Sequence, residues 1–302
     1  MRIKYNIDTI LVCQIGDPMG HSCAAFVHNK MYEVANLNAV CLTVEVKKGG
    51  LPKFIEAART LNMNGFDITM PHKSDIIQYL DVCEESARVF KSVNHVKFVD
   101  GKLHGVGLDG VGMGLAIQHD GIKIKDSSVL ILGAGAVAGP IAADLCQKGA
   151  KRVVVANRTQ EKAKYIADTL KSLYKVETEC GPLSEDYISK AAKSTDILVQ
   201  CTSLGLAGNN AEYESLEFLK ALPKNAAVAD VLYPTSKLLE AAQDLSLKTV
   251  SGMGMMLHQQ FAMMDFRFGI KMPDSALDAA HEALELAIVM RDRRARAKGK
   301  AK

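Results

Sequence analysis

The feature that most constrains this chain is a glycine-rich turn between an apolar run and a helix. The run "VLIL" (Val129–Leu132) has the composition of a buried strand, and "GAGAVA" (Gly133–Ala138) follows it and opens a helical stretch that reaches about Lys148. The spacing G-x-G-x-x-A in this context is typical of a dinucleotide-binding turn, where free N–H groups at a helix start hold phosphates. An ordinary strand-to-helix turn made of small residues is the alternative interpretation.

The end of the next strand indicates which dinucleotide is bound. A site for NAD usually carries an acidic residue there, which binds the ribose hydroxyls. This chain instead has "NRTQEK", with Asn157, Arg158 and Lys162, and Arg158 can hold a 2′-phosphate through its planar guanidinium. The sequence therefore favours NADP over NAD. Thr159 is suited to cap the helix that follows.

Strand and helix patterns alternate along the chain, which implies an α/β layered fold. The length of 302 residues favours two domains. Before residue 110 the expected strands are Thr9–Gly16, Ala39–Val46, Gly65–Met70 and a hairpin at Asn94–Asp109, with helices at 22–36, Pro52–Leu61 and Ser74–Leu80. After residue 128 the expected strands are Val129–Leu132, Arg152–Arg158, Asp196–Thr202, Ala226–Tyr233 and Lys248–Gly252, with a helix at Thr159–Tyr174 and helical patterns after Met255 and from Ser275 to Arg291.

Composition argues against several classes of protein. The net charge of +3 is too small to indicate nucleic-acid binding, and most of it lies in the terminal "RDRRARAKGKAK", which we interpret as the solvated end of a helix rather than a binding tail. No apolar run approaches the roughly 20 residues of a membrane span. Seven cysteines without a C-x-x-C pair indicate neither a disulfide framework nor a metal site. We expect a cytoplasmic protein.

The segment "GFDITMPHK" (Gly65–Lys73) ends a strand abruptly. Pro71 has a fixed φ and restricts Met70 to extended geometry, so the strand must turn there. This turn directs Thr69 and Lys73 into a cleft. A lysine at a strand end is, however, more often a solvated surface residue.

With this segment included, the chain resembles the shikimate/quinate dehydrogenase family over nearly its whole length. "GFDITMPHK" is similar to the family's G-x-N-V-T-x-P-x-K motif, and "GVGLDG" (Gly105–Gly110) to its G-x-N-T-D-G motif. The other similar segments, in order, are "GDPMGHS" (Gly16–Ser22), "SVN" (Ser92–Asn94), "NRT" (Asn157–Thr159), "CTSLG" (Cys201–Gly205), "DVLYP" (Asp230–Pro234) and "GMGMMLHQQ" (Gly252–Gln260).

The resemblance implies two α/β domains. Residues 1–110, completed by 253–302, are expected to bind the substrate, and residues 111–252 to form a Rossmann domain that binds NADP. The implied reaction is the reversible reduction of 3-dehydroshikimate, or 3-dehydroquinate, to the alcohol by hydride transfer. Because an alcohol that loses hydride must also lose its O–H proton, an acid–base group is required. By resemblance, Lys73 and Asp109 are the catalytic pair. We expect the protein to be a monomer or a homodimer.

The resemblance also assigns binding residues. The expected substrate contacts are Ser22, Asp67, Thr69, Asn94, Tyr233 and Gln259. The expected cofactor contacts are Gly133, Ala134, Gly135, Ala136, Val137, Asn157, Arg158, Thr159, Lys162, Val231 and Gly252. Tyr233 as a strand-end aromatic residue and Gln259 as a helix-surface amide are the alternative interpretations.

The chain departs from the family where the substrate is recognised. The family has a second serine at the position of Ala24, and its paired serines help hold the carboxylate of shikimate. The family asparagine before V-T is Asp67 here, which would repel a carboxylate if it faced the pocket ionised. The family's N-T before the catalytic aspartate is Gly107-Leu108, and the segment around "DVLYPTSK" is one residue shorter. Two alternatives therefore stay open: the same chemistry on another cyclic polyol or amino analogue, and a dinucleotide-binding sensor without catalysis.

Overall fold

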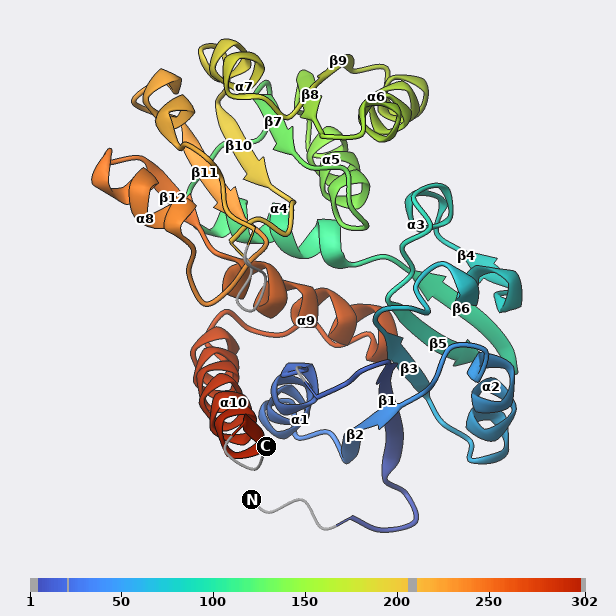
Figure 1. Cartoon of the computed structure of the whole chain (residues 1–302). Helices are drawn as coiled ribbons and strands as arrows, with labels where there is room; N and C mark the ends of the chain where they lie inside the picture. The colour runs from blue at the N-terminus through green and yellow to red at the C-terminus, as the bar shows by residue number, and fades with distance from the viewer. Residues whose placement is uncertain (1–4, 21, 206–210, 300–302) are drawn as a thin grey trace. The chain divides into compact units, whose positions relative to one another are not determined.

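The structure of the chain is a computed structural model that describes residues 5–20, 22–205 and 211–299 (Figure 1). It divides into two compact units, Met1–Leu108 with Gln259–Lys302, and Asp109–His258. The boundaries predicted from the sequence, near residues 110 and 252, lie a few residues from these. The last residues of the basic end, 300–302, lie outside the described part.

The first unit contains a mixed six-stranded sheet in the order β2-β1-β3-β5-β6-β4. β1 pairs in parallel with β2 and β3, whereas β5 is antiparallel to both β3 and β6. The strands are β1 (Ile10–Gly16), β2 (Ala39–Glu45), β3 (Gly65–Ile68), β4 (Val82–Cys83), β5 (His95–Val99) and β6 (Lys102–Val106). The helical segments are α1 (Ala24–Val34), α2 (Leu51–Thr60), η1 (Asp75–Tyr79), α3 (Glu85–Val89), α9 (Gly252–Phe268) and α10 (Ala276–Gly299).

The two faces of this sheet differ in polarity, because successive residues of a strand point to opposite faces. Cys13 and Ile15 of β1 join Phe66 and Ile68 of β3 in one apolar core, which also contains Leu51, Ile55 and Ala58 of α2. On the other face, residues from α1 and α9 meet the sheet in a buried polar cluster, and α10 packs against α1.

The buried polar cluster consists of Asp67 from β3, His95 from β5, His28 from α1 and Arg267 from α9. The Asp67 carboxylate accepts hydrogen bonds from His95 Nδ1 at 2.6 Å and Arg267 Nη2 at 2.5 Å, and His28 Nδ1 lies 3.2 Å from its other oxygen. Arg267 also donates to the Val96 carbonyl at 3.3 Å. The side chains of all four cluster residues are at most 6% exposed.

Electrostatics of the cluster follow from burial and from its one permanent cation. Burial alone would raise the pKa of Asp67, but the guanidinium of Arg267, assisted by His28 and His95, holds that pKa well below its usual range. Burial lowers the pKa of His28 to about 4, against the raising effect of Asp67. At neutral pH the cluster therefore contains one carboxylate and one guanidinium, which compensate each other, beside a neutral His28.

The second unit is built on a fully parallel sheet in the order β12-β11-β10-β7-β8-β9. This is the doubly wound order of a Rossmann domain. The strands are β7 (Ser128–Leu132), β8 (Arg152–Ala156), β9 (Glu177–Gly181), β10 (Ile197–Gln200), β11 (Ala227–Asp230) and β12 (Lys248–Val250). The helical segments are α4 (Asp109–His119), α5 (Ala138–Gln147), α6 (Gln160–Tyr174), α7 (Glu185–Ala192), η2 (Glu217–Ala221) and α8 (Lys237–Asp244).

Helix α4 contains three glycines and begins beside the domain boundary that the sequence predicts near residue 110. Its glycines face α5: a Cβ on Gly110 would lie 2.1 Å from the Pro140 carbonyl oxygen, and one on Gly114 would lie 1.8 Å from an Asp144 oxygen. The helix therefore gives up the higher helix propensity of alanine for close packing. Sequence reasoning missed it because helix propensity is local and this packing is not.

The other expected elements differ from the structure mainly in length and regularity. The predicted helix at Ser74–Leu80 is the short 3-10 segment η1. The sequence patterns did not predict β4, α3, β9, α7, η2 or α8, which are short or largely polar. Within the described part of the chain, no helix combines the length and apolar character that a membrane crossing requires.

We expect the protein to lose stability as the pH falls from about 7 to 5. The unfolded state takes up a proton on His28 near pH 6.5, whereas in the folded state Asp67, His95 and Arg267 surround a His28 whose pKa is about 4. The contribution of neutral His28 to the free energy of unfolding is thus fully present above pH 6.5 and is lost as the pH falls toward 4. The change between pH 7 and 5 is about 2 kcal/mol.

Thermal unfolding of His28→Gln over this pH range checks the assignment. The variant should show a flatter dependence of Tm on pH. His281→Gln is the control, because its side chain is 47% exposed and should leave the dependence unchanged. Equal slopes for wild type and His28→Gln would contradict the assignment.

Candidate active site

In the first unit, the loop that follows β3 is fixed against the end of β1. The N–H of Thr69 donates to the Ile15 carbonyl at 2.9 Å. A Cβ on Gly16 would lie 2.4 Å from the Thr69 side chain and 2.8 Å from the Met70 carbonyl oxygen. Only glycine therefore fits at position 16. Thr69 is half-buried, and its backbone is fixed beside the end of β1.

Lys73 is half-buried, and its backbone is held from two sides. His72 has no exposed surface and donates from Nε2 to the Val46 carbonyl at 2.7 Å. The Lys73 carbonyl accepts from the N–H of Val93 at 3.2 Å, next to Asn94. Sequence reasoning assigned His72 no role. Its position inside the P-x-K motif was the available signal.

Asn94 is 4% exposed and braces the segment that leads to Asp109. Its Oδ1 accepts from the N–H of Leu108 at 2.8 Å, and its own N–H donates to the Val106 carbonyl at 3.0 Å. Part of its side chain therefore holds the backbone beside the candidate catalytic aspartate.

Ser22 is already engaged within the protein. Its hydroxyl donates to Gln14 Oε1 at 2.6 Å, and the Ser22 Oγ accepts from the N–H of Ala24 at 3.4 Å. The Ser22 proton is thus directed at Gln14, an 8% exposed residue of β1. The sequence analysis did not select Gln14, and a polar residue inside a buried strand was the missed signal.

Asp67 would repel a carboxylate only if it faced the pocket as an uncompensated charge, and in the structure its charge is compensated. Asp67 is 4% exposed, and its carboxylate is bound by Arg267 and His95. Its charge is compensated by a residue 200 positions away in the sequence, which no local pattern indicates.

The remaining candidate residues fall at the ends of elements. Asp109 is the first residue of α4 and is 6% exposed. Tyr233 is half-buried in the segment between β11 and α8, and Gln259 is half-buried on α9. Lys73 and Gln259 belong to the first unit, and Asp109 and Tyr233 to the second.

The glycine-rich turn of the second unit has the geometry that its sequence predicts. Gly133 adopts φ +101°, and a Cβ there would lie 2.9 Å from both the Cys201 carbonyl carbon and the Thr202 side chain. The N–H groups of Gly135, Ala136 and Val137 have no partner among the described residues. They lie at the start of α5, where such N–H groups bind anions.

The segment after β8 divides into a brace and an exposed part. Asn157 Oδ1 accepts from the N–H of Ala134 at 3.1 Å, and Nδ2 donates to the Thr159 carbonyl at 2.8 Å, so Asn157 ties the glycine turn to the start of α6. Arg158 and Lys162 are exposed, and neither forms an ion pair with a described residue. Thr159 occupies the N-cap position of α6, but its side chain makes no capping hydrogen bond, contrary to the sequence-based expectation.

Gly252 and Val231 meet beside the end of β11. A Cβ on Gly252 would lie 2.3 Å from the Val231 carbonyl oxygen, and the Gly252 N–H donates to the Leu232 carbonyl at 3.1 Å. Only glycine fits at this approach. The structure thus brings two predicted cofactor residues together.

Two buried polar residues that the sequence analysis did not select hold the neighbouring loops. Gln200 and Asp230 are paired at the ends of β10 and β11. Gln200 Oε1 accepts from the N–H of Thr202 at 2.5 Å, and Asp230 accepts from the Ser236 hydroxyl at 2.5 Å and the Leu232 N–H at 2.9 Å. Burial raises the pKa of Asp230, and these hydrogen bonds oppose it. Each brace stabilises a loop at the carboxyl edge of the sheet, where α/β domains bind ligands.

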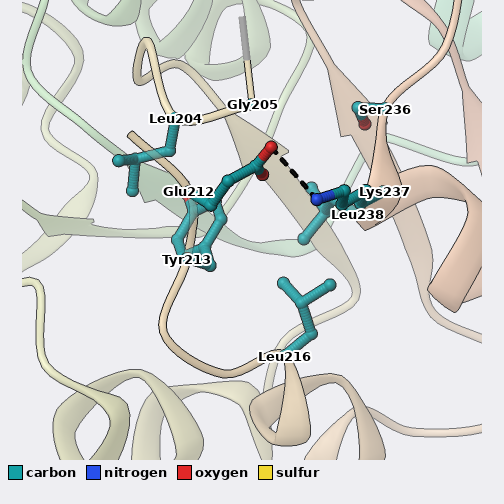
Figure 2. A pocket seen from close by; sticks show the side chains of 8 residues that line it. All are labelled: Leu204, Gly205, Glu212, Tyr213, Leu216, Ser236, Lys237 and Leu238. Carbon is teal, nitrogen blue, oxygen red and sulfur yellow. Dashed lines mark ion pairs between the residues drawn. The ribbon is translucent and has the colours of Figure 1, made fainter. Parts of the chain in front are cut away.

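Figure 2 shows a small pocket of the second unit, lined by residues that include Leu204, Tyr213 and Leu238. An ion pair between Glu212 and Lys237, 3.3 Å long, lies at this pocket. None of the predicted cofactor residues lines it, so we assign it no ligand.

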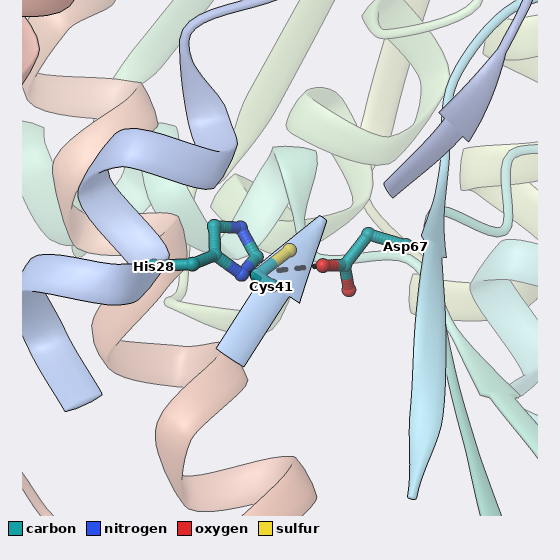
Figure 3. Close-up of side chains that lie close together, drawn as sticks. All are labelled: His28, Cys41 and Asp67. Carbon is teal, nitrogen blue, oxygen red and sulfur yellow. Dashed lines mark ion pairs between the residues drawn. The ribbon is translucent and has the colours of Figure 1, made fainter. Parts of the chain in front are cut away.

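One cluster of possible metal ligands occurs among the described residues, although the sequence predicts no metal site. His28, Cys41 and Asp67 bring their ligand atoms within 4.8 Å of one another (Figure 3). The chemistry of the cluster fits a metal poorly. Arg267 already supplies the positive charge on Asp67, and burial raises the pKa of the Cys41 thiol well above its usual value.

The chain matches known families in both units. Residues 14–96 match the family described as shikimate dehydrogenase substrate binding domain, and residues 115–233 match the one described as shikimate / quinate 5-dehydrogenase. A shikimate dehydrogenase (NADP(+)) of Alkaliphilus oremlandii is 34% identical over 88% of this chain and 94% of its own length. One of Methanocaldococcus jannaschii is 31% identical over 84% and 89%.

Solved structures agree in fold. Shikimate 5-dehydrogenase of Listeria monocytogenes, in complex with shikimate and NAD, has a TM-score of 0.86 at 27% identity, covering 94% of this chain and 98% of its own. The ligand-free 5-ketofructose reductase of a Gluconobacter species has a TM-score of 0.83 at 28% identity, covering 93% and 99%. With both units matched by family models and a relative 34% identical over most of its length, the chain belongs to the shikimate/quinate dehydrogenase family.

Proposed function

We propose that this chain is an NADP-dependent oxidoreductase that interconverts a ring alcohol and its ketone. The leading reaction is the reversible reduction of 3-dehydroshikimate, or 3-dehydroquinate, to the alcohol. The observation that carries the proposal is that two features occur together in this protein. The loop of Lys73 is anchored by backbone and His72 hydrogen bonds, and the glycine turn leaves N–H groups free at the start of α5. The relatives that are named NADP(+)-dependent shikimate dehydrogenases support it.

In this proposal the two units divide the work. Residues 1–110 with 253–302 bind the ring substrate, through Ser22, Thr69, Asn94 and Gln259. Tyr233, which lies in residues 111–252, is the remaining proposed substrate contact. Residues 111–252 bind the dinucleotide. Free cysteines at all seven positions, which all lie in the described part, agree with a reducing compartment such as the cytoplasm.

Lys73 and Asp109 form the acid–base pair. When NADP is bound, its nicotinamide accepts the hydride from the alcohol carbon. Lys73 takes the proton from the substrate oxygen in oxidation and returns it in reduction. Asp109 orients the ammonium group, and its carboxylate favours the charged form of the lysine. His72 and Asn94 act indirectly, because they hold the backbone on either side of these residues.

Arg158 and Lys162 select the cofactor. Both are exposed near the start of α6, and the end of β8 is followed by Asn157 in place of the acidic residue of a usual NAD site. Arg158 binds that phosphate through its planar guanidinium. The N–H groups of Gly135, Ala136 and Val137 hold the pyrophosphate.

A second candidate substrate class is an uncharged cyclic polyol. Ala24 supplies no hydroxyl, and the remaining Ser22 directs its proton to Gln14 rather than outward. Both features weaken the recognition of a carboxylate. The similarity to a 5-ketofructose reductase, whose named substrate is an uncharged sugar, points in the same direction.

Initial rates of NADP reduction with shikimate, quinate and uncharged cyclic polyols test the proposed function. Turnover of at least one ring alcohol with NADP, faster than with NAD, is the expected result. Tight NADP binding without turnover of any of these alcohols would favour a dinucleotide sensor instead.

Replacing Lys73 should abolish proton transfer without unfolding the protein. Lys73→Ala is expected to lower kcat by at least about 10²-fold and to leave Tm nearly unchanged. Lys53→Ala, at an exposed position on α2 of the same unit, is the matched control and should keep normal rates. Near-normal turnover by Lys73→Ala would show that Lys73 is a solvated surface residue and not the acid–base group.

Replacing Arg158 should reveal the choice of cofactor. Arg158→Ala is expected to weaken NADP binding by about 1.5–3 kcal/mol and to change NAD binding little, because only NADP has the 2′-phosphate. Lys171→Ala, on the exposed surface of the same helix, should affect neither cofactor. Equal losses for both cofactors, measured by titration, would reject the assignment.

Restoring the hydroxyls should improve recognition of a carboxylate. Ala24→Ser combined with Gln14→Leu adds one hydrogen-bond donor and frees another. The activation free energy for shikimate, obtained from kcat/KM, should therefore fall by about 1–3 kcal/mol relative to that for an uncharged polyol. Gln14→Leu alone should give the smaller part of this gain. An unchanged ratio, or a wild-type enzyme that already prefers shikimate strongly, would show that Ser22 suffices.

A further inference from the structure

A row of polar side chains crosses the first unit's sheet on one face. Gln14 of β1 is paired with Asp67 of β3, and Asp67 is paired with His95 of β5. Residues paired in this way point to the same face of a sheet. All three are less than 9% exposed. Neighbouring positions on these strands, Cys13, Ile15 and Phe66, are apolar and belong to the opposite core.

Each member of this row is directly connected to a candidate substrate residue. Gln14 accepts the hydrogen bond of Ser22. Asp67 lies two residues before Thr69 on the same strand and loop. His95 follows Asn94 directly, and the Asn94 carbonyl accepts from the N–H of Ile68 at 2.8 Å. The row therefore lies under the three loops that carry Ser22, Thr69 and Asn94.

Arg267 fastens this row to helix α9. Its Nη2 contacts both the Asp67 carboxylate and the Val96 carbonyl, so one guanidinium joins β3 and β5. α9 also carries Gln259, eight residues earlier and thus about 12 Å along the helix. Lys97 adds a second tie, donating from Nζ to the Phe266 carbonyl at 2.7 Å. The rotation and height of α9 against the sheet are thereby restricted.

A buried ion pair is a costly way to stabilise a fold. Apolar side chains of similar volume are often as stable, whereas a buried pair with directional hydrogen bonds holds its partners in one geometry. Here the Asp67–Arg267 pair lies beside the loops that carry Ser22, Thr69 and Asn94. A buried carboxylate of the second unit, Asp144 of α5, pairs instead with a residue four positions later, Lys148, at 2.6 Å.

We propose that Asp67 and Arg267 are positioning residues, which hold the loops of Ser22, Thr69 and Asn94 and the helix of Gln259 in the geometry that binds the ring substrate. This inference rests on the proposed function of the first unit. Neither residue touches substrate. They act through His95, through the backbone of β3 and β5, and through α9.

The test compares Asp67→Asn and Arg267→Lys with Asp144→Asn. Asp67→Asn keeps the shape of the side chain but leaves Arg267 without its counter-charge. Arg267→Lys keeps the charge but loses the planar guanidinium that reaches both Asp67 and Val96. Asp144→Asn is the matched control, since it also converts a buried carboxylate, 5% exposed, into an amide. All rates are measured well below the Tm of the least stable variant.

Asp67→Asn should raise KM for the ring substrate at least about tenfold while KM for NADP stays within about twofold, because small misplacements of binding groups are costly. Arg267→Lys should show a smaller rise. Asp144→Asn should lower Tm without changing KM for the ring substrate. Hydrogen exchange in peptides that contain Thr69 and Asn94 should accelerate only in the Asp67 and Arg267 variants.

The double variant Asp67→Asn with Arg267→Met separates positioning from charge compensation. Removing both charges should recover Tm but not KM, because the ties between β3, β5 and α9 stay broken. Recovery of both values, or an unchanged KM in Asp67→Asn, would overturn the proposal. So would stoichiometric zinc in the purified protein that is lost in His28→Gln, since the cluster would then be a metal site.

The two proposals fail in different ways. If the wild-type protein turns over none of the ring alcohols, the proposed function is wrong. Hydrogen exchange still decides the positioning role in that case, because faster exchange in the Asp144 control, or no change in the Asp67 variant, contradicts it without any substrate.

Discussion

The Asp67–Arg267 pair is the interaction on which the first unit's arrangement depends. It joins β3 to the part of α9 that follows the second unit in the sequence. Burying either charge alone would be strongly unfavourable, so each residue requires the other in place. The return of the chain to its first unit is therefore specified by a charge as well as by apolar packing of α10 on α1.

How far the sequence predicts this protein depends on the range of the interactions. The glycine turn was predictable because Gly133 and the strand before it are neighbours in sequence, and its positive φ is a local requirement. Helix α4 was not, since its glycines serve contacts with α5. The compensation of the Asp67 charge by Arg267 was not predictable, because the two residues are 200 positions apart. His72 was missed for a similar reason, because its partner Val46 is 26 residues away. Gln200 and Asp230 were missed although their partners are close in sequence, because the partners lie in loops whose course no pattern of hydrophobicity shows.

Specificity for the substrate is the part of the function that this chain's own residues modify most. The Lys73 loop and the dinucleotide turn keep the motifs of the family, whereas Gln14, Ala24 and Asp67 change the surroundings of the remaining serine. Gln14 and Asp67 are adjacent in the sheet, so two departures from an apolar or neutral pattern belong to one buried polar row.

Isotope transfer tests the central claim most directly. A ring alcohol with deuterium on its carbinol carbon is incubated with the protein and NADP, and the reduced dinucleotide is analysed by mass spectrometry. Direct hydride transfer predicts that the deuterium appears on the nicotinamide ring with the wild-type protein. With Lys73→Ala, no deuterium should be transferred. Reduced dinucleotide without deuterium, or label that is released to water, would contradict the assignment of this chain as a hydride-transferring dehydrogenase.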